Sequence, residues 1–135
     1  MKKVQAILYK FIDKKLHYLC LKWSEVDGGF WHVVTGTPEQ GETDEECLKR
    51  EILEELGESI KILKISSILK QWIWDKGFEQ IPTNDYALEV SDDLIKLNEE
   101  HTEYKWLNKE EAFSQYKYNS AKEMIGLTDS YLENR

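Results

Sequence analysis

Cysteine, proline and histidine are scarce in this chain of 135 residues, which holds two cysteines, two prolines and three histidines. Cys20 and Cys47 supply neither a disulfide framework nor the repeated cysteine and histidine spacing of a zinc site. We expect Cys47 to be a small packing residue. The disulfide-rich secreted class and the zinc-binding class are therefore excluded, and a cytoplasmic location is expected.

Long apolar runs are also lacking. No stretch approaches the roughly 18 consecutive apolar residues that a membrane-spanning helix needs. The basic N-terminal segment, residues 1–15, alternates like a strand and has no apolar signal-peptide core. We expect no membrane partner. Because 41% of the residues are hydrophobic and five are tryptophan, disorder is excluded, and residues 1–135 are expected to form one domain with its own core.

Positive charge is outweighed by negative charge, with 18 basic and 26 acidic residues and a net charge of −8. Binding to a phosphate backbone requires basic patches, so nucleic acid is not an expected partner. A small polyphosphate remains compatible with this charge, because a bound cation inverts the local field.

Acidic residues instead gather in one segment, residues 36–58, GTPEQGETDEECLKREILEELGE. Glu51, Glu54, Glu55 and Glu58 are spaced to share one side of a helix, where each pair of like charges costs about 0.2–0.5 kcal/mol. A hard divalent cation reverses this penalty, because it requires clustered carboxylate oxygens. The segment therefore predicts a Mg²⁺ site, with Mn²⁺ as the alternative ion.

The same segment has the signals of a helix over residues 43–56. Thr43 and Glu46 form a capping-box pattern at its start, and Gly57 is a natural terminator. The face away from the acids carries an apolar stripe made by Leu48, Ile52, Leu53 and Leu56. We expect this helix to pack on a core while its carboxylates face a cleft.

The spacing resembles the Nudix box, G-x5-E-x7-R-E-U-x-E-E-x-G-U, in which U is a bulky aliphatic residue. The matching residues are Gly36, Glu42, Arg50, Glu51, Ile52, Glu54, Glu55 and Gly57. The last position departs from the pattern, since Glu58 replaces an aliphatic residue. We expect Ile60 to take over its packing role.

The resemblance implies a Nudix-type α/β/α sandwich with a mixed sheet, and Mg²⁺-dependent hydrolysis of a phosphoanhydride. It assigns metal binding to Glu51, Glu54, Glu55 and the backbone of Gly36. It also implies that Glu51 and Glu54 take part in catalysis and that Arg50 orients the carboxylates. The substrate class would be a nucleoside diphosphate linked to a further group.

Two segments, residues 30–43 (FWHVVTGTPEQGET) and 99–107 (EEHTEYKWL), are similar to the bacterial dihydroneopterin triphosphate (dATP) pyrophosphohydrolases. That likeness implies that Glu100, which precedes His101, is a metal-binding and catalytic carboxylate outside the box. It also implies cleavage between the α and β phosphates of a nucleoside or pterin triphosphate, giving a monophosphate and pyrophosphate. For a pterin this is an early step of folate synthesis.

Three tryptophans are candidates for substrate binding. Trp31 precedes the box, and Trp72 and Trp74 lie near the polar segment 71–85. Aromatic faces stack on flat heterocycles with about 1–3 kcal/mol per base. The alternative is that all three pack within the fold. The histidines lack metal-ligand spacing and are expected to be structural or exposed.

Other substrates and roles stay open. The same chemistry suits a dinucleoside polyphosphate, ADP-ribose or an oxidised nucleotide, although Val34-Thr35-Gly36 differs from the Pro-Lys-Gly common in diadenosine tetraphosphate hydrolases. A nucleotide-sensing module without hydrolysis is a further alternative, against which the complete set of box carboxylates counts. Composition is compatible with a monomer or a homodimer.

The remaining pattern predicts alternating strands and helices around one mixed sheet. Expected helices besides the box helix cover residues 109–116 and 120–132. Segment 75–85, which contains Gly77 and Pro82, is expected to be a loop. Expected strands cover residues 4–10, 16–23, 30–35, 60–65, 68–74, 86–90 and 104–107.

Overall fold

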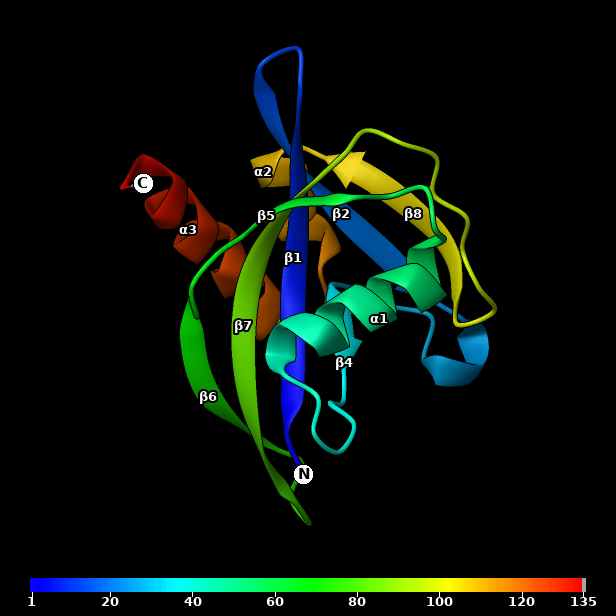
Figure 1. Ribbon diagram of the computed structural model, residues 1–135, viewed down its shortest axis with the longest axis vertical. Helices are drawn as coiled ribbons and strands as arrows, with labels where there is room; N and C mark the ends of the chain where they lie inside the picture. Colours follow the sequence, from blue (N-terminus) through cyan, green and yellow to red (C-terminus); the bar gives the residue numbers. More distant parts are fainter. Residues whose placement is uncertain (135) are drawn as a thin grey trace.

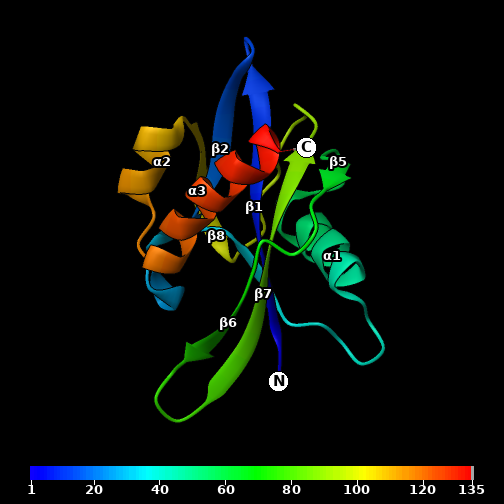
Figure 2. The ribbon, with the colours of Figure 1, turned by 90° about the vertical axis from the view of Figure 1, so that its left-hand side faces the viewer.

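The computed structural model describes residues 1–134, which form a mixed sheet between helices. Figure 2 shows helix α1 on one face of the sheet and helices α2 and α3 on the other. The helices are α1 (Asp44–Leu56), α2 (Lys109–Gln115), α3 (Asn119–Glu133) and the short 3-10 helix η1 (Glu25–Asp27). The strands are β1 (Lys3–Ile12), β2 (Lys15–Trp23), β3 (Trp31–His32), β4 (Val34–Gly36), β5 (Ile62–Ile65), β6 (Lys70–Asp75), β7 (Gln80–Val90) and β8 (His101–Leu107).

Strands β1 and β7 form the parallel centre of the sheet (Figure 1), and the other pairings are antiparallel. Strand β2 pairs with β1 and with β8, while β5 and β6 pair with different parts of β7. This arrangement confirms the expected sandwich with a mixed sheet.

The expected single strand over residues 30–35 is wrong in detail, because the segment changes partner. Strands β1 and β2 pair only from Tyr9 and Tyr18 toward their hairpin turn. Where they separate, β3 pairs with β2 and β4 pairs with β1. The segment before the box helix therefore bridges the two diverging strands.

The loop expected over residues 75–85 is also wrong, because β7 already begins at Gln80. Pro82 is tolerated there because β1 pairs with β7 only from Thr83 onward. At Pro82 the sole strand neighbour is β6, through Ile73, so this part of β7 is an edge, where proline costs no ladder bond on the open side.

The core lies on both faces of the sheet, since β1 is buried on both sides. Val4, Ala6 and Leu8 pack in a cluster with α1, whereas Ile7 and Tyr9 pack with residues of α2 and α3. Such burial on both faces is typical of a central strand in a layered α/β fold. Within residues 1–134, no helix is both long and apolar enough to cross a bilayer.

Helix α1 forms as its sequence predicts, except that Leu53 of the expected apolar stripe is 57% exposed. Thr43 and Glu46 make both bonds of the capping box, and Gly57 follows the helix with a φ of 92°. The structure corrects the placement of Glu58, which lies beyond the helix and is exposed. Ile60 is buried in the cluster under α1, as expected for the aliphatic residue that replaces it in packing.

Candidate metal and catalytic site

The second half of α1 presents carboxylates at three depths. The Glu54 side chain is 55% exposed, Glu51 is 15% exposed and Glu55 is 4% exposed. The helical spacing places them on neighbouring turns, and Glu55 shares the buried face of α1 with Leu48 and Ile52. A graded set of acids therefore runs from solvent toward the core.

Glu55 lies beside two residues from the segment that leads into β8. Glu100 and His101, at the start of β8, place ligand-type atoms within 4.8 Å of a Glu55 oxygen and of each other. His101 Nε2 lies 3.5 Å from Glu55 Oε1. The structure thus brings the predicted carboxylate outside the box, Glu100, to the box helix.

The buried carboxyl of Glu55 has no compensating charge. Burial, followed by the negative charges of Glu51, Glu100 and Glu54, raises the pKa of Glu55 well above its ordinary value. Among residues 1–134, its Oε2 atom has no hydrogen-bond partner. Burial also lowers the pKa of His101, which disfavours the charged ring that could serve as a counterion. This uncompensated set of oxygen donors fits a divalent cation.

His101 is a member of this cluster that sequence analysis did not assign to it. The histidine pattern lacked metal-ligand spacing, so His101 was expected to be structural or exposed. Its only signal was its position next to Glu100. Its proximity to Glu55 depends on the pairing of β8 with β2, which sets His101 opposite Trp23.

Arg50 links the loop before α1 to the carboxylates of the helix through hydrogen bonds. Its guanidinium donates two hydrogen bonds to Glu42, at 2.8 and 2.9 Å, and one to Glu51 Oε1 at 2.8 Å. A further bond of 3.1 Å reaches the carbonyl of Thr37. The bidentate pair lowers the pKa of Glu42 to about 2. Glu54 lies farther away, at 3.6 Å, so Arg50 orients Glu51 in particular.

Gly36 is required by the close approach of β4 to α1. A Cβ atom at this position would lie 2.5 Å from Cγ of Glu51 and 3.1 Å from Sγ of Cys47. A larger residue would therefore displace the Glu51 side chain or separate strand from helix. Cys47 is fully buried and not in a disulfide, which confirms its expected packing role.

The tryptophans predicted for substrate binding are half-buried. Trp72 and Trp74 lie on the same face of β6 and stack with ring centroids 5.8 Å apart, while Ile73 between them is exposed. Trp31 packs against the cluster of α2 and α3, and Lys105 Nζ lies 4.9 Å from its ring centre. Trp72 and Trp74 therefore present stacked aromatic rings on one face of β6.

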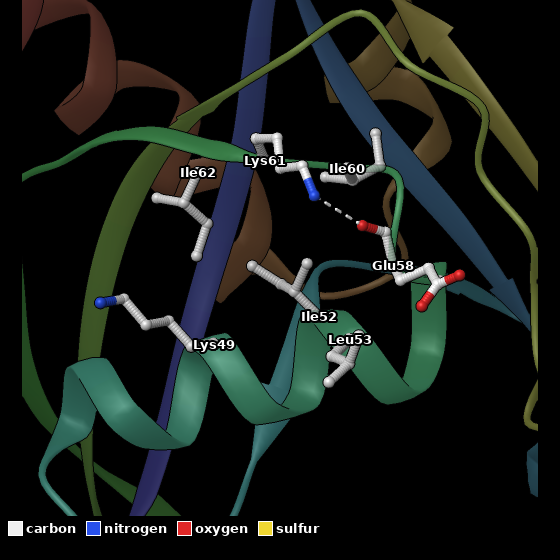
Figure 3. A pocket seen from close by; sticks show the side chains of 8 residues that line it. Lys49, Ile52, Leu53, Glu58, Ile60, Lys61 and Ile62 are labelled. Atoms are coloured by element: carbon white, nitrogen blue, oxygen red, sulfur yellow. Dashed lines mark hydrogen bonds between the residues drawn. The ribbon is translucent and has the colours of Figure 1, made fainter.

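A groove of about 340 Å³ lies on another side of α1, between that helix and β5. Figure 3 shows Lys49, Ile52, Leu53 and Ile62 around it, and none of Glu51, Glu55 or Glu100 lines it. The carboxylate cluster and this groove are separate features.

Comparisons with known proteins agree with this geometry. The family model of the NUDIX domain matches residues 1–127. Nucleoside triphosphatase NudI of Escherichia coli K12 is 30% identical, over 79% of this chain and 84% of that protein.

Two solved structures share the fold. The Ap4A hydrolase of C. elegans, in a binary complex, has a TM-score of 0.82 and 18% identity, with 99% of this chain and 98% of that chain covered. The dihydroneopterin triphosphate pyrophosphohydrolase of E. coli has a TM-score of 0.67 and 21% identity, with 98% and 96% covered. With the family match over nearly the whole chain, the carboxylate helix and the mixed sheet identify this chain as a member of the NUDIX family, a Nudix hydrolase acting on phosphoanhydride bonds.

Proposed function

We propose that this chain is a Mg²⁺-dependent pyrophosphohydrolase of a nucleoside or pterin triphosphate. It cleaves between the α and β phosphates and releases a monophosphate and pyrophosphate. The observation that carries the proposal is the buried carboxyl of Glu55, which has Glu100 within 4.8 Å and the negative charges of Glu51 and Glu54 nearby. Such a set of oxygens is stabilised by a divalent cation.

In this proposal Glu51, Glu54, Glu55 and Glu100 would hold the cation with their carboxylate oxygens. The carbonyl of Gly36 would supply a further oxygen beside Glu51. When bound, Mg²⁺ neutralises the phosphates and makes the attacking water more acidic; Mn²⁺ would serve the same purpose.

The protein groups then position the reaction. Arg50 fixes the carboxylate of Glu51, so that Glu51 accepts the proton of the attacking water at a defined place and Glu54 assists it as a neighbouring negative charge. Hydrolysis of phosphoanhydrides needs little covalent help from the protein, so positioning and charge carry the rate.

The triphosphate class is supported by the relative NudI, which is named a nucleoside triphosphatase. Within that class, dihydroneopterin triphosphate and dATP are the proposed substrates, because residues 30–43 and 99–107 resemble enzymes of that activity. The likeness to Ap4A hydrolase is at the level of fold alone, so dinucleoside polyphosphates, ADP-ribose and oxidised nucleotides are the competing substrates.

The test is turnover of dihydroneopterin triphosphate and dATP with Mg²⁺, with products identified by phosphorus NMR. We expect pyrophosphate and a monophosphate from the wild-type protein and none from Glu55→Gln. Glu45→Gln, the same change at an exposed position of α1, serves as the control and should keep full activity. Turnover of a dinucleotide polyphosphate alone would overturn the substrate class, and binding without hydrolysis of any such compound would indicate a sensing module.

A further inference from the structure

A second group of buried polar side chains lies on the face of the sheet covered by α3. Asp85 of β7 and Gln5 of β1 are direct cross-strand partners, on the same face as the buried pair Ile7 and Ala87. Trp72 of β6 lies on this face too, because it pairs with Thr83, two residues from Asp85. His32 joins the group through a contact of 3.2 Å between its Nε2 and Nε2 of Gln5. We call these four residues, Asp85, Gln5, Trp72 and His32, the Asp85 cluster.

Three members of the Asp85 cluster have a buried polar atom that has no hydrogen-bond partner in the described part of the chain. These atoms are Oδ1 of Asp85, Oε1 of Gln5 and Nδ1 of His32, while the indole N–H of Trp72 faces the Asp85 carboxyl. Asp85, Gln5 and His32 are at most 1% exposed. Buried polar groups in folded proteins are almost always paired. Three such atoms on neighbouring side chains indicate a molecule that supplies the missing donors and acceptors.

Half-buried rings surround these atoms. Trp74 stacks on Trp72 and makes an edge contact with Tyr118, at centroid distances of 5.8 and 6.3 Å. Tyr118 also packs edge-on against His32 at 5.3 Å and Phe30 at 5.2 Å. A polar floor with aromatic walls is the arrangement by which proteins bind a planar heterocycle, through hydrogen bonds to its edge and contacts with its faces.

Ring contacts also connect the Asp85 cluster to the candidate metal site. Trp23 lies between His32 and His101, with centroid distances of 6.3 and 5.8 Å. His101 in turn lies beside Glu55. This succession of contacts connects His32 to Glu55, so a phosphate chain attached to a heterocycle at the Asp85 cluster would extend along it toward the carboxylates.

We propose that the Asp85 cluster binds the heterocycle of the substrate and that Asp85 selects rings with a ring N–H next to an exocyclic amine. This inference rests on the proposed function. A carboxylate is an acceptor at both oxygens, so it complements two adjacent donors. Guanine and pterin present that amino-oxo edge, so of the two proposed substrates the Asp85 cluster favours dihydroneopterin triphosphate over dATP. Adenine and cytosine place an unprotonated ring nitrogen beside the amine, and thymine has no exocyclic amine.

The electrostatics of Asp85 agree with this assignment. Burial raises the pKa of Asp85 to about 6, and the nearby Trp72 indole N–H and the charge of Lys70 oppose that rise. The carboxyl is therefore ionised at neutral pH, and its Oδ1 has no donor among the residues that the structure describes. The Trp72 N–H, which faces this carboxyl in the free protein, is the donor for the exocyclic oxygen that flanks the N–H of a bound amino-oxo edge.

The inference is tested by comparing dGTP with dITP, which lacks only the 2-amino group. We expect kcat/KM of the wild-type protein to be about 10–100-fold higher for dGTP, because dITP leaves one carboxylate oxygen unpaired. In Asp85→Asn the ratio should fall to within about threefold of unity. Asp93→Asn, the same change at an exposed position, should keep the wild-type ratio. An equal rate on both nucleotides in the wild-type protein, or an unchanged ratio in Asp85→Asn, overturns the proposal and leaves the unpaired atoms to structural water.

A second variant tests the indole N–H of Trp72 as a hydrogen-bond donor to the heterocycle. Trp72→Phe keeps the ring and removes the indole N–H. It should lower kcat/KM about 3–10-fold for dGTP and dITP alike and leave hydrolysis of inorganic tripolyphosphate, which has no ring, unchanged. Equal loss on tripolyphosphate would contradict a contact with the heterocycle. Failure of the proposed function is distinguishable, because the wild-type protein would then hydrolyse no triphosphate, whatever its base.

Discussion

At the scale of single residues, two buried carboxyls define the chemistry of this molecule. Glu55 lies among other acids of α1 and β8, and Asp85 lies under aromatic rings on the opposite layer. Burial raises the pKa of both side chains. A buried charge without a partner is costly in free energy, so each marks a place where a bound molecule improves the stability of the fold.

Removing the charge of Glu55 should separate metal binding from folding. For the wild-type protein we expect the melting temperature to rise with added MgCl₂, since a ligand at about 100 times its Kd adds about 2.7 kcal/mol to the free energy of unfolding. Glu55→Gln should lose this rise without losing stability in EDTA, because burial raises the pKa of Glu55 to about 9, so its carboxyl is neutral without the metal and the amide replaces a neutral group. Differential scanning fluorimetry across a MgCl₂ series measures both. A wild-type response in the variant would exclude Glu55 as a ligand.

The pKa of Asp85 predicts a pH-dependent difference in stability. Its folded value of about 6 exceeds the ordinary 3.8, so the penalty for the charge is absent below pH 4, grows through this window and is complete above pH 6. Asp85→Asn should therefore be more stable than wild type by about 1–3 kcal/mol at pH 8, and this advantage should vanish near pH 4. Urea unfolding at the two pH values measures it; a difference that does not change with pH would contradict the burial of the charge.

The pKa of His32 should make the stability of the fold depend on pH in the opposite direction. Burial, followed by the charge of His101, lowers the pKa of His32 to about 4. Its contribution to stability is present above the ordinary value of 6.5 and is lost as the pH falls toward 4. In Asp85→Asn this loss is no longer offset by protonation of Asp85. Unfolding curves at pH 7 and 5 should therefore show a larger loss of stability in the variant than in the wild-type protein, and an equal loss would contradict the assignment.

At the scale of elements, the site depends on how closely β4 approaches α1. Gly36→Ala adds a carbon 2.5 Å from Cγ of Glu51. We expect a stability loss of about 1–3 kcal/mol from this overpacking and a larger loss in Mg²⁺ affinity, measured by calorimetry. Gly41→Ala is a useful comparison, because a Cβ at Gly41 meets no atom within 4 Å, although its φ of 80° carries backbone strain. Mg²⁺ affinity unchanged in Gly36→Ala would contradict a role for this contact.

The start of α1 also has a contact that its sequence did not predict. Asp44 was expected to complement the helix dipole, but its carboxylate accepts hydrogen bonds from Asn84 at 2.9 Å and Tyr86 at 2.5 Å and pairs with Lys2. Burial opposes these bonds, yet together they lower the pKa of Asp44. They join the helix to β7, so the box helix is fixed at its first turn as well as by its apolar face.

At the scale of the whole molecule, the parallel pair β1 and β7 is the centre to which every layer attaches. Both core clusters include residues of these two strands. Amides that are buried on both sides open only with global unfolding. We expect hydrogen exchange, followed by mass spectrometry, to be slowest in β1 and in residues 83–89 of β7 and fast at the β6–β7 hairpin tip, where Phe78 is 87% exposed. Slow exchange at the tip would indicate a covering contact.

The sequence by itself determined the box helix and its chemistry. Its caps, its apolar stripe and the spacing of Arg50, Glu51 and Glu55 are local features, because residues three and four apart on a helix are neighbours whatever the rest of the chain does. The same locality explains why the family was predictable. The place of Glu100 beside the helix could be expected only through a resemblance, since no spacing connects it to the helix.

Only the tertiary structure decided which residues from distant segments lie in contact. The pairing of β8 with β2 brings His101 to Glu55, and the pairing of β1 with β7 brings Gln5 to Asp85. Pro82 and Gly77 favoured a loop, yet β7 passes through the first of them because that edge lacks a second neighbour. Strand pairing and burial arise between residues far apart in the chain, so they set the surroundings of Glu55 and Asp85 where local sequence pattern does not reach.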